Sequence, residues 1–205
     1  STTDNPLVFP ETNDGKSTII SQGNFHGEVL ALCADRMSLA LFELGSISER
    51  RMDQLLDSKK SGLPPFLAVN SGLESGMMIV QYSAGSALAE MHGHAAPRTS
   101  FSTSTSAGQE DHVSMGATAC WNLYQSCIRL SEVLACELII ACQGLEYNKL
   151  TPAPFVKSLH KLVRTISPKL TEDRSTSAEL LSIAKILRDG TWLSRIEAEN
   201  ERLIR

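Results

Sequence analysis

Residues 28–57, which read EVLALCADRMSLALFELGSISERRMDQLLD, decide the class of fold. The stretch contains no proline and a single glycine, Gly45, and its apolar residues recur at the spacing of a helix face. It predicts one long helix, or two helices placed end to end, with a total length of about 45 Å. This is more than most small domains of such a size require.

Two further runs have helical patterns. Residues 75–95 are rich in alanine, methionine and other small residues, which allow close helix approach, and residues 111–143 form the most apolar run. We expect Asp111 to cap the start of that run and Gly144 to end it. Because apolar residues cover most of its circumference, this helix is expected to be central.

The remaining segments are shorter. Amphipathic helices are predicted near 155–166 and 176–189, and a solvated helix or fraying tail at 193–205. Residues 98–108 are rich in serine and threonine. They suit a polar β-like stretch or an exposed loop, and a loop is favoured because no partner strand is evident in the chain.

These patterns predict an all-α chain, a bundle of long helices. We place a central bundle segment at 1–145 and a C-terminal helical segment at 146–205. Helices this long would leave their ends unpacked in an isolated bundle, so a homo-oligomer or a companion segment is predicted. The chain opens at Ser1 without an initiator methionine, and we expect it to be cut from something longer.

Composition excludes several classes of protein. The 205 residues are 42% hydrophobic and 20% charged, with a formal net charge of −4, which argues against a disordered chain and against nucleic-acid or membrane-surface partners. No apolar stretch is long enough to span a membrane, and no signal peptide is evident, so a cytoplasmic location is expected. The five cysteines include no CxxC pair. They predict buried thiols in a reducing compartment rather than a metal site.

Two segments concentrate polar and ring residues directly before the predicted helices. They are residues 22–28, QGNFHGE, and residues 106–115, SAGQEDHVSM. Each places a glycine and side-chain amides or carboxylates at a helix N-terminus, where ligand polar groups bind readily. The alternative for each segment taken alone is an N-cap with neighbouring solvated charge.

Several stretches, in order and with similar spacing, resemble the aromatic amino acid ammonia-lyases, and most of all the histidine-specific members. The matching stretches are residues 4–9, 23–28, 45–51, 63–67, 109–115 and 141–145. The resemblance implies the C-terminal part of the ammonia-lyase (fumarase/aspartase-like) fold, with two active-site loops in the segment 1–145. It also implies elimination of ammonia from an aromatic amino acid, in this case L-histidine to urocanate, in a homotetramer.

The resemblance also implies roles for single residues. Phe25 would pack beside the substrate ring and the prosthetic group, and Glu110 would face the substrate imidazole or amine. A carboxylate there favours histidine, because the phenylalanine-specific plant enzymes have glutamine in the equivalent place. Supporting substrate-binding roles, with simple capping as the alternative, fall to residues Asn24, Gln109 and His26.

The family's electrophile, a methylidene-imidazolone made from an internal Ala-Ser-Gly, has no source in this chain. Ser83-Ala84-Gly85 and Ser106-Ala107-Gly108 have the right residues in the wrong order. We therefore expect the prosthetic group to come from a segment outside the chain, either the N-terminal part of the same enzyme or a companion subunit. No metal is expected, and the isolated chain is predicted to be inactive. The alternatives are an inactive helical paralogue used for oligomerisation or regulation, and a phenylalanine or tyrosine ammonia-lyase.

Overall fold

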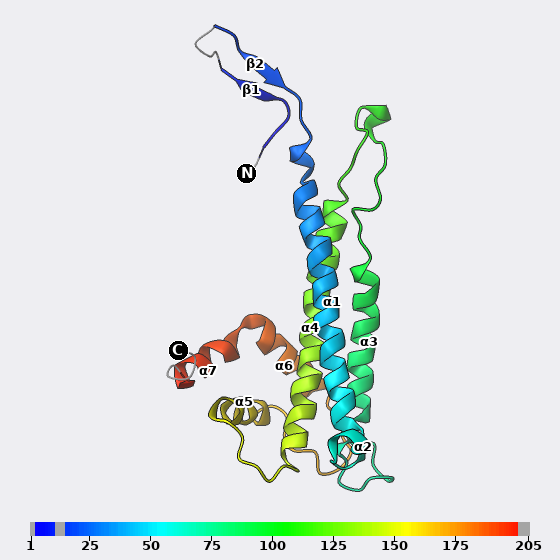
Figure 1. Cartoon of the computed structure of the whole chain (residues 1–205), viewed down its shortest axis with the longest axis vertical. Helices are drawn as coiled ribbons and strands as arrows, with labels where there is room; N and C mark the ends of the chain where they lie inside the picture. The colour runs from blue at the N-terminus through cyan, green and yellow to red at the C-terminus, as the bar shows by residue number, and fades with distance from the viewer. Residues whose placement is uncertain (1–2, 11–14, 201–205) are drawn as a thin grey trace. The chain divides into compact units, whose positions relative to one another are not determined.

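The structure, a computed structural model, describes residues 3–10 and 15–200 and is largely helical (Figure 1). Its α-helices are α1 (Glu28–Leu56), α2 (Ser58–Ser61), α3 (Met78–Ala95), α4 (Gly116–Leu145), α5 (Pro154–Arg164), α6 (Ser177–Asp189) and α7 (Thr191–Asn200). Short 3-10 helices are η1 (Asn24–His26), η2 (Pro65–Leu67) and η3 (Ser106–Gly108). The prediction of a helical chain built on three long helices is confirmed, and the first run forms one continuous helix.

A β-hairpin precedes η1, although the sequence predicts no strand pairing. Strand β1 (Leu7–Phe9) pairs antiparallel with β2 (Thr18–Ile20), with Val8 opposite Ile19. The expectation that the chain lacks partner strands is therefore wrong. Both strands are mostly exposed, with Val8 at 65% and Ile19 at 68%. They consequently lack the alternation of buried and exposed residues by which a strand is recognised in a sequence.

The chain divides into two compact units, one of Ser1–Leu39 with His94–Tyr124 and one of Ala40–Gly93 with Gln125–Arg205. The boundaries fall inside α1, α3 and α4. In the first unit, the beginnings of α1 and α4 pack through Ala31, Ala34 and Ala119. Small side chains at this contact allow the two helix backbones to approach closely. The predicted boundary at residue 145 stays a prediction.

The second unit contains the larger apolar core. Its portions of α1, α3 and α4 lie side by side (Figure 1). On α3 the buried residues Val80, Ala84, Ala87 and Met91 recur every three or four positions and form one stripe. Helices α5 and α6 both contact α7, in which Ile196 is buried, so the helical part of the predicted solvated tail has a packed side. Residues 201–205 of that tail lie outside the described residues.

Both predicted ends of the most apolar helix are wrong. Helix α4 begins at Gly116, not after Asp111, because residues 111–115 run as an irregular segment in which Met115 has a φ of 54°. The Ser114 hydroxyl accepts a hydrogen bond from Gly116 N–H (3.2 Å) and takes the place of the expected cap. At the other end, Gly144 lies inside the last turn of α4, which continues to Leu145, so it does not end the helix.

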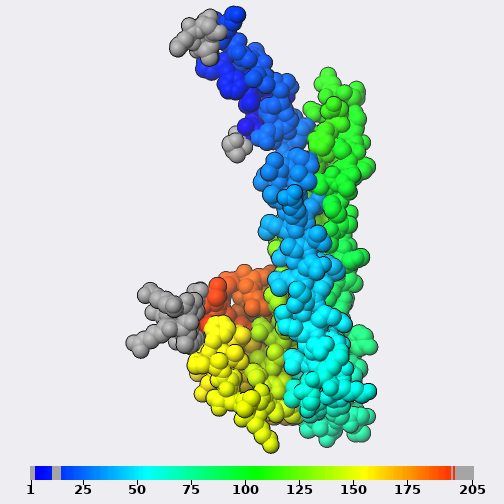
Figure 2. Space-filling model, in the orientation of Figure 1, coloured from blue at the N-terminus to red at the C-terminus, as the bar shows by residue number. Residues whose placement is uncertain are grey.

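Three of the five cysteines, and several large apolar side chains on α1 and α4, are exposed rather than buried. Cys136 and Cys142 are buried, and burial raises the pKa of Cys136 to about 12 and that of Cys142 to about 11. Cys33, Cys120 and Cys127 are exposed, so the prediction of buried thiols is wrong for these three. They belong to helices that also expose large apolar side chains, namely Val29, Leu30, Leu32, Met37 and Leu39 on α1 and Trp121 and Tyr124 on α4. Figure 2 shows how much of the early part of α1, in blue, lies at the surface.

A half-buried carboxylate in the second unit makes folding stability depend on pH. The Glu137 Oε2 accepts hydrogen bonds from Arg51 Nη2 (2.8 Å) and from the buried Ser48 hydroxyl (2.6 Å). Burial raises the pKa of Glu137, but the hydrogen bonds from Arg51 and Ser48 and the Arg51 charge outweigh burial and lower the pKa below its usual value. The contribution of ionised Glu137 to the free energy of unfolding is therefore complete above its unfolded-state pKa of about 4.3. It is lost as the pH falls through the lower folded-state pKa.

Glu137→Gln is accordingly expected to lower the free energy of unfolding at pH 7 by about 1–3 kcal/mol, because it removes an ionised hydrogen-bond acceptor. The difference from the wild type should shrink as the pH is lowered below the unfolded-state pKa and Glu137 itself becomes protonated. Urea unfolding at several pH values measures this, with Glu43→Gln on the exposed face of α1 as the control. A difference that stays constant with pH would show that the charge of Glu137 contributes nothing.

Candidate functional site

The first of the two polar segments forms a tight bend before α1. Residues 24–26 make the 3-10 turn η1, in which His26 N–H donates to Gly23 O and Gly27 N–H donates to Asn24 O, both at 3.1 Å. Gly27 has a φ of 70°, a left-handed conformation that glycine adopts without strain. The chain then enters α1 at Glu28. This bend sets the His26 ring beside the helix start rather than along the helix.

The second polar segment, residues 106–115, continues the narrow loop that begins at residue 98, and a loop is the structure predicted for residues 98–108. Thr105 and Glu110 bond to each other across it, with Thr105 N–H donating to Glu110 O (3.0 Å) and Glu110 N–H to Thr105 O (3.3 Å). The tip between them is η3. The loop is anchored to α1 at its start, where the buried Asp35 carboxylate accepts from Thr99 N–H (2.9 Å) and from the Thr99 hydroxyl (2.8 Å).

Burial raises the pKa of Asp35, but hydrogen bonds from Thr99 and Arg98 and the charge of Arg98 together leave the pKa below its usual value. Asp35 is therefore held as a carboxylate that fixes the root of the loop.

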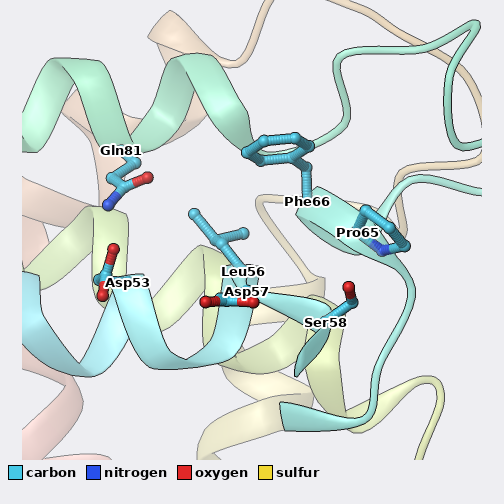
Figure 3. A pocket seen from close by; sticks show the side chains of 7 residues that line it. All are labelled: Asp53, Leu56, Asp57, Ser58, Pro65, Phe66 and Gln81. Carbon is cyan, nitrogen blue, oxygen red and sulfur yellow. The ribbon is translucent and has the colours of Figure 1, made fainter. Parts of the chain in front are cut away.

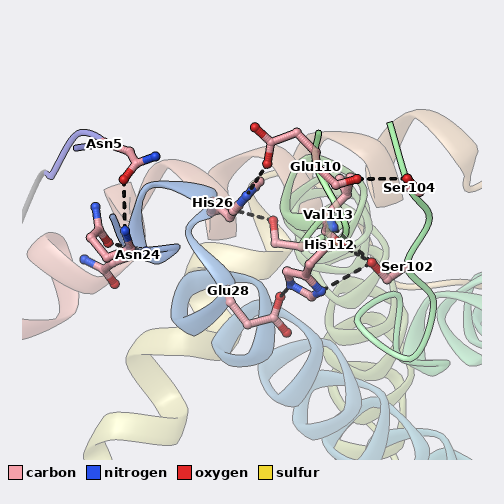
Figure 4. A network of polar contacts seen from close by, with 11 residues as sticks. Asn5, Asn24, His26, Glu28, Ser102, Ser104, Glu110, His112 and Val113 are labelled. Carbon is pink, nitrogen blue, oxygen red and sulfur yellow. Dashed lines mark hydrogen bonds and ion pairs between the residues drawn. The ribbon is translucent and has the colours of Figure 1, made fainter. Parts of the chain in front are cut away.

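The two segments meet at an ion pair between His26 and Glu110. The His26 Nε2 lies 3.2 Å from Glu110 Oε2, and the His26 side chain is 18% exposed against 41% for Glu110 (Figure 4). The Phe25 ring lies against the His26 ring, with centroids 4.2 Å apart and planes inclined by 31°. Three of the predicted site residues thus lie together, with Glu110 open to solvent on one side.

A second histidine and carboxylate pair lies beside the first. The His112 Nε2 is 3.1 Å from Glu28 Oε2, and the His112 Nδ1 is 3.3 Å from the Ser102 hydroxyl (Figure 4). The rings of His26 and His112 meet edge to face, with centroids 5.9 Å apart. Glu28, Ser102 and His112 have no role predicted from the sequence, although Glu28 and His112 belong to the two quoted segments.

The other two predicted residues lie apart from the pair. The Asn24 Nδ2 donates to Thr3 Oγ1 (2.9 Å), so its side chain is directed towards the N-terminal segment. Gln109 is exposed, and its backbone N–H donates to Ser106 O (3.2 Å). Their substrate-binding roles stay predictions.

The arrangement is suited to binding a polar, flat ligand group. A carboxylate with one free side can accept a hydrogen bond from a ligand N–H, and the histidine paired with it restrains its position. Among the described residues, no group of three or more histidine, cysteine, aspartate or glutamate side chains is placed to hold a metal ion. Within the same residues, no helix has both the length and the apolar character needed to cross a membrane.

A separate hollow lies in the second unit, next to the end of α1. Figure 3 shows Asp53 and Gln81 facing each other beside Leu56, with Phe66 at the other end. Lys60 Nζ lies 2.9 Å from Asp53 Oδ2 and thereby neutralises the carboxylate. None of the predicted site residues lines this hollow, and its two carboxylates, Asp53 and Asp57, both pair with Lys60.

The chain matches the family model described as aromatic amino acid lyase over residues 1–165. It is 46% identical to histidine ammonia-lyase of Deinococcus radiodurans over 198 residues, which are 97% of this chain and 37% of that protein. It is also 42% identical over 191 residues to histidine ammonia-lyase of a Geobacillus species, covering 93% of this chain and 37% of that protein.

Solved structures give the same result. Histidine ammonia-lyase from Trypanosoma cruzi superposes with a TM-score of 0.86 at 38% identity, over 96% of this chain and 38% of that chain. Tyrosine aminomutase from Streptomyces globisporus superposes with a TM-score of 0.86 at 31% identity, over 96% of this chain and 37% of that chain. The chain therefore belongs to the aromatic amino acid lyase family, which confirms the resemblance read from its motifs. It spans about 37% of the length of the curated relatives named above.

Proposed function

We propose that this chain is part of an ammonia-lyase that converts L-histidine to urocanate. The observation that carries the proposal is the Glu110 carboxylate, paired with His26 beside the Phe25 ring and open to solvent on one side. An imidazole is flat, bears N–H donors and is partly cationic near neutral pH, so it matches both the ring and the carboxylate. The relatives named histidine ammonia-lyase add support.

The proposed roles follow from what each side chain offers. Glu110 would accept a hydrogen bond from the substrate imidazole or amine, and His26 would hold that carboxylate in place through its Nε2. Phe25, which is 40% exposed, would pack its ring beside the substrate ring. Asn24 and Gln109 would support the loops on either side. Together these contacts would bind and orient the substrate, which lowers the barrier by fixing the reacting geometry.

The family's methylidene-imidazolone group supplies an electrophile that activates the amine for departure. The residues of this chain do not fit its formation, because cyclisation needs serine between alanine and glycine. Ser83–Gly85 lies within the regular helix α3, and Ser106–Gly108 has the order Ser-Ala-Gly with Ala107 at a φ of 56°. The roles proposed for this chain are therefore limited to binding and orienting the substrate, and we propose that another segment of the enzyme supplies the electrophile.

We also propose that the working enzyme is an oligomer, as the family resemblance implies for a homotetramer. The exposed apolar side chains early in α1, such as Leu30 at 70%, together with Trp121 at 60% on α4, suit burial against other helices. A companion segment with the Ala-Ser-Gly sequence would then complete the site. The chain together with such a segment is called the assembled lyase below.

The test follows urocanate formation from histidine by the 205-residue chain alone and by the assembled lyase. We expect no product from the chain alone and turnover from the assembled lyase, with the companion segment alone as the control. Activity from the 205 residues by themselves would contradict our conclusion about the missing triplet. A folded assembly that is inactive would instead favour a helical paralogue used for oligomerisation or regulation.

The same assay, run with phenylalanine and tyrosine, addresses the second candidate function. The 31% identity to a tyrosine aminomutase over nearly the whole chain is the observation that favours a different aromatic substrate. We expect histidine to be preferred because its imidazole has N–H groups that can donate to the Glu110 carboxylate. A hydrocarbon ring has no such donor. Preference for tyrosine or phenylalanine would overturn the substrate proposal while leaving the class of reaction intact.

A further inference from the structure

We propose that Glu28 and His112 form a positioning pair that fixes where the Glu110 carboxylate lies. The inference rests on the proposed function, because it assigns these residues a role through Glu110. Neither residue needs to touch the substrate. Both belong to the first unit, as do all the residues to which they are bonded.

Three contacts tie the bend at residues 24–28 to the segment that carries Glu110. The His26 ring pairs with Glu110, the Ser114 hydroxyl donates to His26 O (2.7 Å), and Glu28 pairs with His112. The last contact lies between the other two along the segment 110–114. It therefore restrains the middle of a stretch that belongs to no regular element.

Ser102 connects His112 and Val113 to the opposite side of the loop. Its hydroxyl oxygen accepts from Val113 N–H (2.9 Å) and lies 3.1 Å from Val113 O and 3.3 Å from His112 Nδ1. Glu28 is thus connected through one imidazole to both sides of the loop whose tip is η3. A glutamate in the first turn of α1 would favour the helix by itself, but helix capping does not require a histidine from another segment.

The hydrogen bonds from His112 to Glu28 and to Ser102 can form in both charge states of His112. A carboxylate only accepts, so Nε2 must carry a proton to bond Glu28. In neutral His112, Nδ1 then accepts from the Ser102 hydroxyl. In protonated His112, Nδ1–H donates to Ser102, whose own proton turns to Val113 O. The pair can therefore hold the loop whether or not the imidazole is charged.

The consequence for Glu110 is one of position. Misplacing a reacting or binding group by about 1 Å can cost about a hundredfold in rate. Glu110 is 41% exposed and is bonded through its side chain to His26. Without Glu28 and His112, the segment between Glu110 and Ser114 would lose its central restraint, and the carboxylate would sample positions unsuited to the substrate.

The kinetic test uses the assembled lyase with His112→Leu, His112→Gln and Glu28→Leu. We expect each leucine variant to lower kcat/KM for histidine about tenfold. The double variant with both leucines should be no worse than either alone, because each substitution removes the same hydrogen bond between Glu28 and His112. His112→Gln retains an N–H that reaches Glu28 and should recover activity to within about threefold. In a Glu110→Gln background, His112→Leu should have less than about a twofold further effect, since the pair acts through Glu110.

A spectroscopic readout separates this inference from the proposed function. In the 205-residue chain, NMR of the ring nitrogens is expected to show His26 signals in His112→Leu that differ from those in His112→Gln, because only the glutamine keeps a hydrogen bond to Glu28. Both variants lack the second ring, so ring-current effects are matched. Circular dichroism checks folding, and Asp189→Asn, which breaks the exposed Lys185–Asp189 pair (2.8 Å) in α6, is the control for loss of an ion pair.

Two results would overturn the positioning role. One is a His112→Leu effect that multiplies fully with that of Glu110→Gln, which indicates a general structural role. The other is identical His26 signals in the folded His112→Leu and His112→Gln chains. If the wild-type assembly fails to convert histidine, the proposed function fails instead, and the NMR comparison still decides whether the pair positions His26 and Glu110.

Discussion

Glu110→Gln in the assembled lyase is expected to lower kcat/KM for histidine by about tenfold to a hundredfold. Glutamine keeps the shape of the side chain but removes its charge. Hydrogen bonds to charged groups contribute about 1.5–3 kcal/mol, and every 1.4 kcal/mol corresponds to a factor of ten. The substitution also weakens the contact with His26, whose Nε2 lies 3.2 Å from the carboxylate. Steady-state kinetics with histidine measure the loss.

The substrate dependence of this variant is the more specific readout. If Glu110 contacts the substrate imidazole, its charge matters only for a ring that bears N–H donors, so phenylalanine turnover should fall less than histidine turnover, or rise. Equal losses for both substrates would indicate contact with the amine. Asp189→Asn serves as the control, since it removes a carboxylate in α6 of the second unit. Histidine kinetics unchanged by Glu110→Gln would show that the carboxylate does not contact the substrate.

Gly76→Ala is expected to lower the free energy of unfolding by about 3 kcal/mol or more. Gly76 has a φ of +57°, and a Cβ placed there would lie 2.6 Å from Phe66 O and 2.9 Å from Ala68 Cβ. Phe66 O already accepts from Met77 N–H (2.8 Å), and Gly76 N–H donates to Asp173 (2.9 Å). The added methyl group therefore meets backbone that is fixed on both sides and cannot move away cheaply.

The matched control is Gly85→Ala, in the interior of α3. A Cβ at Gly85 would meet nothing within 4 Å, and the position is exposed. Alanine in a helix interior is more stable than glycine by about 0.5–1 kcal/mol, so this variant should gain stability. Urea unfolding of both variants gives the comparison. Equal effects of the two substitutions would mean that the close approach at Gly76 is not a constraint on the fold.

Much of the helical fold follows from local pattern. The pattern places the first helix to within one residue, because residues 28–56 combine helical spacing with an absence of proline. It misplaces the start of α4 because side chains distant in sequence compete for the segment before it, as Ser102 does for Val113. The exposed cysteines escape prediction since a helical pattern identifies an apolar face but not whether the same chain covers that face.

The site is predictable only in part, and through resemblance rather than spacing. The motifs single out Phe25, His26 and Glu110, which do lie together. They do not indicate the pairing of Glu28 with His112, because a glutamate at a helix start has an ordinary explanation as a favourable helix-terminal charge. Only the fold brings the two polar segments side by side and reveals what joins them.

The unequal cores of the two units bear on how such a site can evolve. The first unit packs α1 against α4 through a small alanine contact, whereas the large apolar cluster, with Met52, Met91 and Ile139, belongs to the second unit. The shape of the site therefore depends on polar contacts at a solvent-facing surface more than on buried hydrocarbon. We therefore expect substitutions there to cost less folding free energy than substitutions in the large cluster, which would let selection change substrate preference without unfolding the chain.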